Sequence, residues 1–443
     1  MNPVQPPPTA SPAPYRVEVV SGIEELPAGL WDRLAPGDDP MWSRALFAAM
    51  ERSRLGPAGY AYLVVRHLGA NDAVAAVLPV CLFRDLRLDQ VVGARERRLL
   101  APLQRLLPRL FPRLMRVPML FCGHLLGQGH VLLDGPAEAG LGDVLVDAVL
   151  DLARRERLGT VVFKDFTAAG LQPLRPALRR AGFFLVPSLP DTELRLDQPT
   201  FEEYLAALPA KPRRNARSKI RAFAARTDLR IEVLDDFAHL LPEVLALYRQ
   251  VMLRADQTLD VLDSAFLAAV HADPAPHPGG PARPPAGRQR LGNPERPPGG
   301  TPAGDGRSRR RLVACFEGER LVAFLLCFFA GRGATGARIG LDYRIAHDAR
   351  LYHAVHHAAI RLAIASGCRT IRFAQTAYRP KLEMGCELVE QWYAMTHVRP
   401  LPRAVLRRLL PPALTAARDA ALGPHATPRP GPARLNPPTP TTP

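Results

Sequence analysis

The chain of 443 residues is too long for one ordinary hydrophobic core, so it predicts two or more domains. Hydrophobic residues make up 47% of it, which excludes a chain that is disordered throughout. The formal net charge of +16 would favour a nucleic-acid partner, but 54 of the 58 basic residues are Arg, in a chain rich in Ala, Pro and Leu. That pattern is typical of a G+C-rich coding bias, so the charge alone does not indicate nucleic-acid binding.

Cysteine usage and hydropathy predict a cytoplasmic protein without a membrane span. The start of the chain, MNPVQPPPTASPAP, lacks the charged and apolar regions of a signal peptide. The longest apolar run, LVAFLLCFFA from Leu321 to Ala330, is far shorter than the roughly 20 residues that a membrane-spanning helix needs. The cysteines form no CxxC pair and are expected to be reduced thiols; they are Cys81, Cys122, Cys315, Cys327, Cys368 and Cys386.

Three segments have a composition that is typical of disorder. Residues 1–14 and 423–443 are rich in Pro, about 272–309 is rich in Pro, Gly and Arg, and none of the three shows apolar periodicity. We therefore expect a disordered N-terminus, a disordered insertion and a disordered C-terminal tail.

The rest of the chain repeats one order of elements. Residues 60–85 and 311–331 each read as a β-hairpin, with two apolar strands around a polar turn. Residues 141–166 and 351–376 each read as an amphipathic helix followed by a strand, with Thr160 and Phe163 opposite Thr370 and Phe373 at one constant offset. A short helix and a glycine follow in both halves. The sequence thus predicts hairpin, strand, helix, strand, helix and strand, twice.

This layout resembles the GNAT superfamily of acyltransferases, and more closely its two-domain branch, the FemAB-like and BioF2-like (CelD-like) acetyltransferases. The stretches FEEYLAALPAKPRRNARSKIRAF, GLDYRIAHDARLYHAVHHAAIRLAIASGCRTIRF and FAQTAYRPKLEMGCEL carry the resemblance. It implies an α/β protein with a tandem GNAT-like fold, in which two mixed central sheets are flanked by helices. We expect a first domain at 15–198 and a second at 199–422 that contains the insertion.

The resemblance also implies a donor site. In the GNAT pattern an acyl-CoA lies in a splay between two central strands, with its pyrophosphate at a helix N-terminus. The second unit has Arg350 at this place but no glycine. Because of this difference, the donor could instead be an aminoacyl-tRNA, as it is for the FemAB-type enzymes that the chain resembles. In the first unit Gly123, Gly127 and Gly129 could let the backbone approach a phosphate, although glycines around a turn have the same pattern.

Four residues are candidates for catalysis. Transfer to an amine needs a neutral nucleophile, so a base or a water path must take a proton from an ammonium with a pKa of about 10.4. Asp342 and Tyr343 end a predicted strand where such a base would face the acceptor. Tyr378 and Lys381 match the Tyr/Lys pattern of the family and could donate to the leaving group or hold an acceptor anion. A strand-end hydrogen bond and a surface Lys beside a helix are the structural alternatives.

Three histidines on one helix raise the question of a metal. His353, His356 and His357 are spaced i, i+3 and i+4, but position 354 is Ala where an HExxH site has Glu. No Cys or carboxylate stands at ligand spacing either. We expect no metal and interpret this as a half-buried helix face.

A dense basic segment precedes the second unit, with six Lys or Arg side chains between Lys211 and Arg221. The pattern predicts an amphipathic helix with a basic face and an apolar side at Ile220 and Phe223. We expect it to contact an anionic ligand such as CoA, a lipid phosphate or a nucleotide-linked precursor, with a solvated face as the alternative. The basic face comprises Lys211, Arg214, Arg217 and Arg221.

Two segments alternate Leu with Arg, at residues 95–116 and 401–414. Either could lie on an anionic membrane surface. Prolines interrupt the first, so short connecting helices over the sheet are the preferred interpretation. A peripheral membrane contact stays a hypothesis.

Together these features predict a cytoplasmic N-acyltransferase, with membrane-peripheral placement as an option. It would transfer an acetyl or other acyl group from acyl-CoA, without a metal, to the amine of a small molecule or a cell-envelope precursor by direct attack. The alternatives are a FemAB-type aminoacyl or peptidoglycan-precursor transferase, for which aminoacyl-tRNA is the one expected nucleic acid, and a catalytically inactive GNAT-like binding protein.

Overall fold

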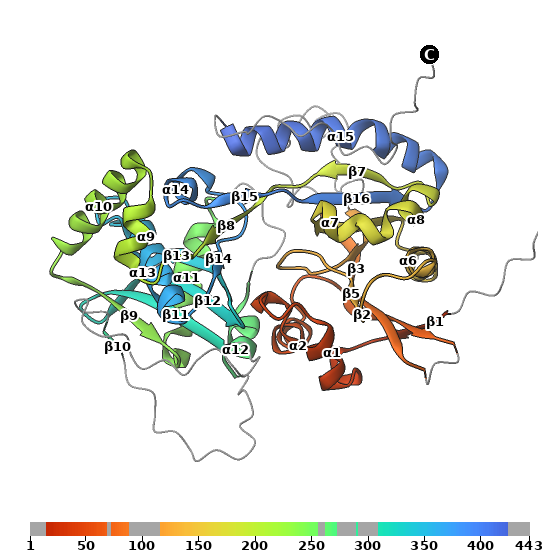
Figure 1. The fold of residues 1–443 in the computed structure, drawn as a ribbon, viewed down its shortest axis with the longest axis horizontal. Helices are drawn as coiled ribbons and strands as arrows, with labels where there is room; N and C mark the ends of the chain where they lie inside the picture. Colours follow the sequence, from red (N-terminus) through yellow and green to blue (C-terminus); the bar gives the residue numbers. More distant parts are fainter. Residues whose placement is uncertain are drawn as a thin grey trace, which may run out of the picture.

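The computed structural model describes residues 15–68, 72–87, 116–255, 262–272, 289–290 and 309–423. These residues form two large mixed sheets, each flanked by helices, side by side (Figure 1). The Leu/Arg segment at 95–116 and the three segments expected to be disordered lie outside the described residues, apart from residues 116, 272, 289–290, 309 and 423.

The first sheet has the strand order β1-β2-β3-β4-β6-β16-β7, with β5 beside β3. Its neighbours are antiparallel except β4 and β6, which are parallel. The strands are β1 (Tyr15–Val20), β2 (Gly59–His67), β3 (Val74–Arg87), β4 (Arg116–Cys122), β5 (Leu132–Leu133), β6 (Thr160–Phe166), β7 (Phe184–Pro187) and β16 (Trp392–His397).

The second sheet has the order β10-β9-β11-β12-β13-β14-β8-β15. Its neighbouring strands are also antiparallel except for one pair, β13 and β14, which are parallel. Its strands are β8 (Asp191–Arg195), β9 (Leu229–Leu234), β10 (Gln289–Arg290), β11 (Arg309–Glu317), β12 (Arg320–Ala330), β13 (Gly333–Leu341), β14 (Thr370–Arg372) and β15 (Glu387–Val389). The predicted hairpins are β2–β3 and β11–β12.

Helices cover both faces of each sheet. The apolar run predicted from the sequence is β12, whose side chains alternate between two buried clusters, with Phe324 in one and Leu325 in the other. The helices are α1 (Ala28–Leu34), α2 (Arg44–Ser53), α6 (Leu141–Arg155), α7 (Ala168–Leu171), α8 (Arg175–Arg180), α9 (Phe201–Ala207), α10 (Ala210–Ala224), α11 (Leu241–Met252), α12 (Ser264–Ala272), α13 (Leu351–Ala365), α14 (Tyr378–Glu383) and α15 (Pro400–Leu422), with 3-10 turns at Ile23–Glu25, Pro40–Trp42, Gln172–Leu174 and Ala238–Leu240.

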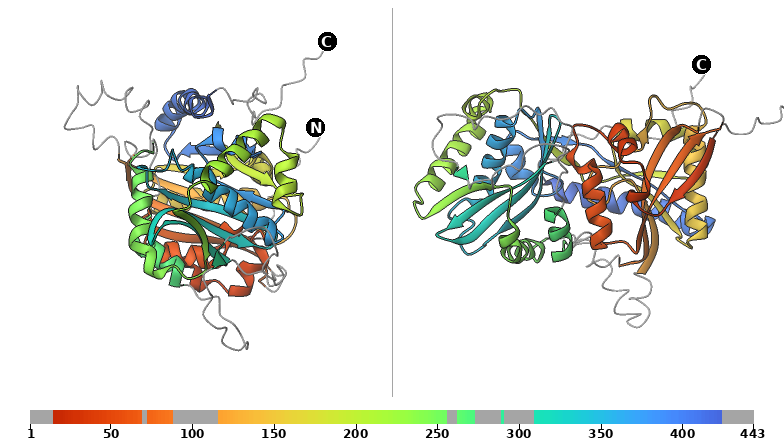
Figure 2. Two further views of the ribbon diagram at one scale, coloured as in Figure 1. Left: turned by 90° about the vertical axis from the view of Figure 1, so that its left-hand side faces the viewer. Right: turned by 90° about the horizontal axis from the view of Figure 1, so that it is seen from below.

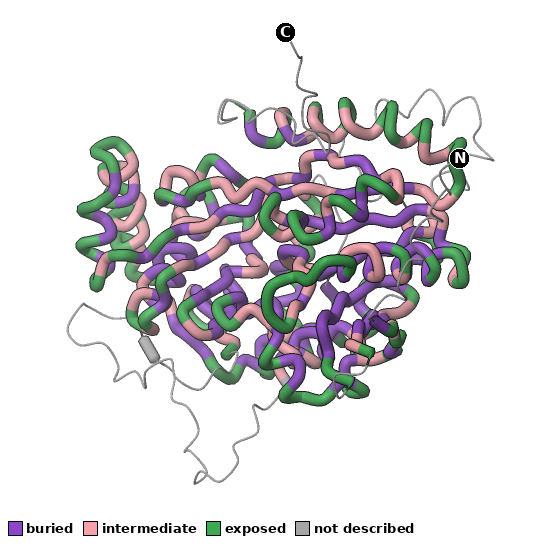
Figure 3. The backbone as a smooth tube through the Cα atoms, turned by 45° about the vertical axis from the view of Figure 1, so that its right-hand side comes forward, coloured by how far each residue is buried: buried purple, intermediate pink, exposed green. Residues whose placement is uncertain are grey.

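One of the hydrophobic clusters belongs to both units. It joins the aromatic side chains Trp31, Trp42 and Phe47 under the first sheet to Phe316 and Phe324 under the second. The helices α2 and α12 lie side by side where the units meet (Figure 2). Figure 3 shows the central strands of both units as mostly buried, with exposed residues gathered on the helices and turns. The two units therefore share a core.

The two units exchange their last strands. In chain order β7 is followed by β8, but β7 lies in the first sheet and β8 in the second. Likewise β15 lies in the second sheet and β16 in the first. The crossing segments, 188–190 and 390–391, remain paired, because the N–H of Ser188 donates to the carbonyl of Gln391 at 2.9 Å. Residues 184–195 and 387–397 thus form one antiparallel ribbon that runs through both sheets (Figure 1).

The predicted internal repeat is present in three dimensions. The helices α6 and α13 have 15 residues each, and both start after a residue in the left-handed region, Gly140 (φ 86°) and Arg350 (φ 55°). A cut of the chain at residue 198 would leave β8 with the first unit and β16 with the second, so each sheet takes one strand from the other half of the chain.

The shared ribbon and core predict that both units unfold together. All three Trp residues (Trp31, Trp42 and Trp392) lie in the first unit or on its sheet, so Trp fluorescence reports on that unit. We expect Phe324→Ala, in the second sheet, to destabilise the protein by about 3–5 kcal/mol, the usual cost of removing a buried Phe. The urea midpoint by Trp fluorescence should fall as far as the midpoint by far-UV circular dichroism. A fluorescence midpoint that stays at the value of the exposed-site control Leu253→Ala would contradict cooperative unfolding.

Candidate active site

The second sheet opens between β13 and β14. The two strands pair only from Gly333 to Thr335, and β13 then continues to Leu341 without this neighbour. On its other side β13 has a bulge, since Gly336 pairs with Cys327 and Arg338 with Leu326, which leaves Ala337 as the extra residue. Residues 337–339 are partly exposed although they lie in the middle of a sheet. The edge of β13 is therefore accessible at this point.

Buried hydroxyl groups lie beside the opening. A Cβ on Gly336 would be 2.8 Å from the ring of Phe373, so this ring lies close to the β13 backbone. The Phe373 ring contacts His356, and the His356 ring stacks on that of Tyr352 with 4.1 Å between the ring centres. The hydroxyl of Tyr352 and that of Thr335 are both buried, and neither has a hydrogen-bond partner among the described residues. Such groups cost free energy unless a ligand or water satisfies them.

The helix α13 begins at the open end of β13, after the turn 342–350. Its N-cap residue Arg350 is in the left-handed conformation and makes no side-chain cap, and no acidic residue lies in the first helical turn. The partial positive charge of a helix N-terminus attracts anions, and the half-buried guanidinium of Arg350 adds a full charge. Arg350, which the sequence suggested for phosphate binding, thus adjoins the opening.

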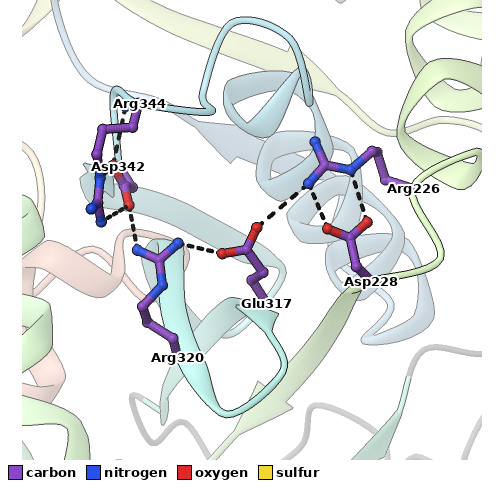
Figure 4. A network of polar contacts seen from close by, with 6 residues as sticks. All are labelled: Arg226, Asp228, Glu317, Arg320, Asp342 and Arg344. Carbon is purple, nitrogen blue, oxygen red and sulfur yellow. Dashed lines mark hydrogen bonds and ion pairs between the residues drawn. The ribbon is translucent and has the colours of Figure 1, made fainter.

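The carboxylate of Asp342 is held in an ion-pair network (Figure 4). It accepts hydrogen bonds from Arg320 Nη1 at 2.5 Å and from Arg344 Nε and Nη2 at 3.0 and 2.6 Å. These guanidinium contacts hold the pKa of Asp342 well below its usual range. The carboxylate is then a poor proton acceptor at neutral pH, which argues against the role of base that the sequence suggested.

The same network connects three strand ends. Arg320 also pairs with Glu317, and Glu317 lies 3.5 Å from Arg226, which forms an ion pair with Asp228. It therefore fixes the end of β13 against the β11–β12 turn and the segment before β9 (Figure 4). Tyr343, next to Asp342, is 37% exposed, and Arg254 lies 4.0 Å from the centre of its ring.

Lys381 and Tyr378 are buried at the start of α14. The ammonium of Lys381 donates to the carbonyl oxygens of Phe373, Ala374 and Gln375 at 2.5, 2.9 and 3.0 Å. The loop turns these carbonyls inward by adopting positive φ at residues 374, 376 and 377. Burial lowers the pKa of Lys381 to about 8. The Tyr378 hydroxyl donates to the carbonyl of Pro190 at 2.9 Å, in the crossing segment.

Sequence reasoning missed a partly buried charge cluster where the units meet. Arg372 contacts Asp39 Oδ2 at 3.0 Å and Glu193 Oε2 at 2.8 Å, so it joins a first-unit carboxylate to the exchanged strand β8. Asp191, at the start of β8, is also buried, and burial raises its pKa to about 6. No local signal could reveal this cluster, because Asp39 and Arg372 are 333 positions apart.

The three glycines of the first unit serve close packing. A Cβ on Gly129 would lie 2.3 Å from the carbonyl oxygen of Lys164, and one on Gly123 would lie 2.9 Å from the ring of Phe166. Their N–H groups donate to Asp165 and Pro79 backbone oxygens, and that of Gly127 donates to His124 Nδ1. The loop therefore fills the space beside β4 with protein, and the N–H groups predicted to bind phosphate are already engaged.

The predicted basic helix is α10, and Ile220 and Phe223 pack against the core as expected. Lys219 on its inner side lies 2.9 Å from His353 Nε2 and 2.7 Å from Glu383 Oε2, which ties α10 to α13 and α14. The outer side chains are exposed and have no ion-pair partner among the described residues; they are Lys211, Arg214, Arg217 and Arg221.

The histidines of α13 have separate partners. His356 Nδ1–H donates to the carbonyl of Tyr352, His357 packs on the ring of Phe201, and His353 contacts Lys219. Burial lowers the pKa of all three, so they are neutral at pH 7. In the part of the chain that the structure describes, no group of three or more His, Cys, Asp or Glu side chains is arranged to hold a metal ion.

No protein-family model matches the chain, and no curated protein matches it. Among solved structures, a tandem GNAT protein from the clavulanic acid biosynthesis pathway is 13% identical with a TM-score of 0.45, over 87% of this chain and 99% of that chain. FemX is 10% identical with a TM-score of 0.49, over 85% and 96%. Saccharomyces cerevisiae N-myristoyltransferase with bound myristoyl-CoA and inhibitors is 10% identical with a TM-score of 0.42, over 88% and 81%.

The fold class follows from the two sheets themselves. In the first sheet β1, β2, β3 and β4 are antiparallel neighbours, β6 is parallel to β4, and β16 lies between β6 and β7. The second sheet repeats this order with β9, β11, β12 and β13, then β14, and with β8 between β14 and β15; β10 adds a short strand outside β9. This is a tandem of two GNAT-like units, and the fold predicted from the sequence is confirmed. None of the described helices has the length and apolar character to cross a membrane.

The raised pKa of Asp191 predicts a pH dependence of stability. The unfolded chain releases this proton near pH 3.8, whereas the folded protein holds it until about pH 6. Between these values the folded state binds more protons, so rising pH favours unfolding. Relative to Asp191→Asn, wild type should lose about 2 kcal/mol of unfolding free energy from pH 4 to pH 7. Urea titrations at both pH values measure this, and equal losses in the two proteins would contradict the assignment.

Proposed function

We propose that the protein is an N-acyltransferase of the GNAT type, which moves an acyl group from acyl-CoA, most simply acetyl-CoA, to an amine. The observation that carries the proposal is the accessible edge of β13 beside the N-terminus of α13. An opening inside a sheet is uncommon, because strand edges normally pair. The first unit has its corresponding space filled by the 123–129 loop, so we place the reaction in the second unit.

The residues at this opening suit an acyl-CoA. The helix N-terminus and Arg350 offer positive charge to its pyrophosphate, and the uncovered edge of β13 offers backbone groups to its extended amide-containing arm. The buried hydroxyls of Thr335 and Tyr352 give the site unsatisfied polar groups. When bound, the acyl-CoA supplies an acyl group that is activated as a thioester.

The chain's own residues would orient the reactants and handle protons. Backbone N–H groups near the Ala337 bulge can stabilise negative charge on an acyl oxygen, as in other acyl transfers. The amine attacks as the neutral form and loses a proton, while the sulfur leaves and gains one. Tyr343 is exposed beside the opening and suits contact with a bound ligand. Tyr378 and Lys381 hold the loop after β14, and we propose that they position its backbone against the acceptor.

The proposed acceptor is the amine of a small molecule or of a cell-envelope precursor. The buried carboxylate of Asp191 and the partly buried carboxylate of Glu193 lie next to the loop after β14, where negative charge would favour a cationic group. Amine acceptors are cationic before they react.

Calorimetric titration with acetyl-CoA and with the non-reactive desulfo-CoA tests the proposal. Wild type should bind both with a Kd of about 1–100 μM. Arg350→Glu should weaken binding about tenfold or more, because it reverses a charge at the pyrophosphate position. Arg155→Glu, an exposed reversal at the end of the equivalent helix α6, is the matched control and should bind like wild type.

Two results would contradict the proposed acyl-CoA site. Absence of binding to both CoA compounds in folded wild-type protein would remove the donor class. Equal binding by Arg350→Glu and the control would remove the proposed position.

An aminoacyl transferase of the FemAB type is the second candidate. The turn 345–350 contains no glycine, and the exposed basic face of α10 suits a polyanion larger than CoA. Binding of aminoacyl-tRNA together with no binding of acetyl-CoA would favour this candidate.

The basic face of α10 gives a separate prediction. Changing Lys211, Arg214 and Arg217 together to Gln should weaken binding of the anionic substrate about tenfold at low salt, with a smaller difference at 0.5 M NaCl. Titrations at two salt concentrations measure this. Changing Arg179, Arg180 and Arg33 of the first unit to Gln removes the same charge elsewhere and serves as the control. Unchanged affinity in the α10 variant would make this helix a solvated face.

A further inference from the structure

The helix α15 has a buried face that fixes it to the first sheet. Leu406, Leu410 and Leu414 pack against the core, and the helix lies over β7 and β16 along one edge of the molecule (Figure 1). Near its end, Arg418 is buried and lies 2.5 Å from Glu390 in the crossing segment. The helix is thus held in a defined orientation, so its other face is directed away from the protein.

That outward face is apolar. Leu401, Val405 and Leu409 are 80%, 54% and 59% exposed, and their four-residue spacing places them on one side of the helix. They are three of the seven large hydrophobic side chains that are exposed in the described part of the chain. Figure 3 shows the outer turns of this helix as exposed. Exposed Leu side chains are ordinary singly, but a row of them on one helix marks a contact surface.

Basic side chains accompany the apolar row. Arg407 and Arg408 are exposed, and neither has an ion-pair partner among the described residues. At 3.6 residues per turn Arg408 lies beside the apolar row, whereas Arg407, two residues from Val405 and from Leu409, lies on another side of the helix. No Asp or Glu occurs in α15 before Asp419. The outward face therefore combines apolar side chains with uncompensated positive charge.

We propose that this face of α15 docks the protein on an anionic lipid surface. An interfacial helix lies flat, with its apolar row between the headgroups and its basic side chains on lipid phosphates. A helix of 23 residues is about 35 Å long, so several headgroups can contact it at once. The unpaired arginines favour an anionic bilayer over an apolar groove of a protein, in which they would lose their hydration without a partner. The inference does not depend on the proposed reaction.

Vesicle flotation of the full-length protein tests this proposal. Wild type should float with phosphatidylcholine vesicles that contain phosphatidylglycerol, and far less with phosphatidylcholine alone. The variant Leu401→Ser/Val405→Ser/Leu409→Ser should reduce the floated fraction about fivefold or more. Arg407→Gln/Arg408→Gln should reduce it at low salt and leave the apolar row intact. Leu253→Ser removes an equally exposed apolar side chain (84%) from the second unit and should float like wild type.

Several outcomes would overturn the docking surface. One such outcome is wild-type protein that stays in the soluble fraction in the presence of anionic vesicles. Another is a triple Ser variant that floats as well as wild type. Equal flotation with neutral vesicles would remove the role of the arginines. A concentration-dependent dimer in size-exclusion chromatography, lost in the triple Ser variant, would assign the face to a second copy of the chain.

Discussion

The antiparallel ribbon formed by residues 184–195 and 387–397 is the feature on which the rest of this structure depends. It supplies the inserted final strand of both sheets, and the order of these strands means that each unit is completed by the other half of the chain. A buried strand that lacks a partner on one edge leaves backbone N–H and C=O groups unpaired, which costs free energy. Neither unit thus has a complete central sheet without the other, and the common hydrophobic cluster under both sheets adds to this dependence.

The ribbon also positions the charged residues of the candidate site. It carries Asp191 and Glu193 into the second sheet next to Arg372, which contacts Asp39 of the first unit. In its crossing segment, the carbonyl of Pro190 accepts a hydrogen bond from the hydroxyl of Tyr378. The helix α14 also carries Lys381, whose ammonium donates to three carbonyl groups. The two units then diverge in function, because protein fills the space beside β4 in the first, whereas the edge of β13 is accessible in the second. One half supports the other structurally, and the reaction is proposed in the second.

Local sequence patterns predicted the elements well and their long-range partners poorly. The hairpins, the helices α6 and α13 and the tandem fold were predictable, because apolar periodicity and the repeat offset are properties of short segments. Nothing in such a segment distinguishes a strand that stays in its own sheet from one that crosses to another. The Tyr/Lys pattern made Lys381 a candidate, but its three carbonyl partners depend on the positive φ angles of the loop before α14, which the sequence does not show. Asp342 was predicted as a base because the sequence does not show that Arg320 and Arg344 surround it.

Expression of the chain as two fragments, 1–198 and 199–443, tests the strand exchange most directly. If each sheet needs a strand from the other half, each fragment alone should be unfolded or aggregated, and the two expressed together should form a stable one-to-one complex with the circular dichroism spectrum of the intact protein. A folded, monomeric 1–198 fragment, in which β8 takes the place of β16 in its own sheet, would contradict the exchange.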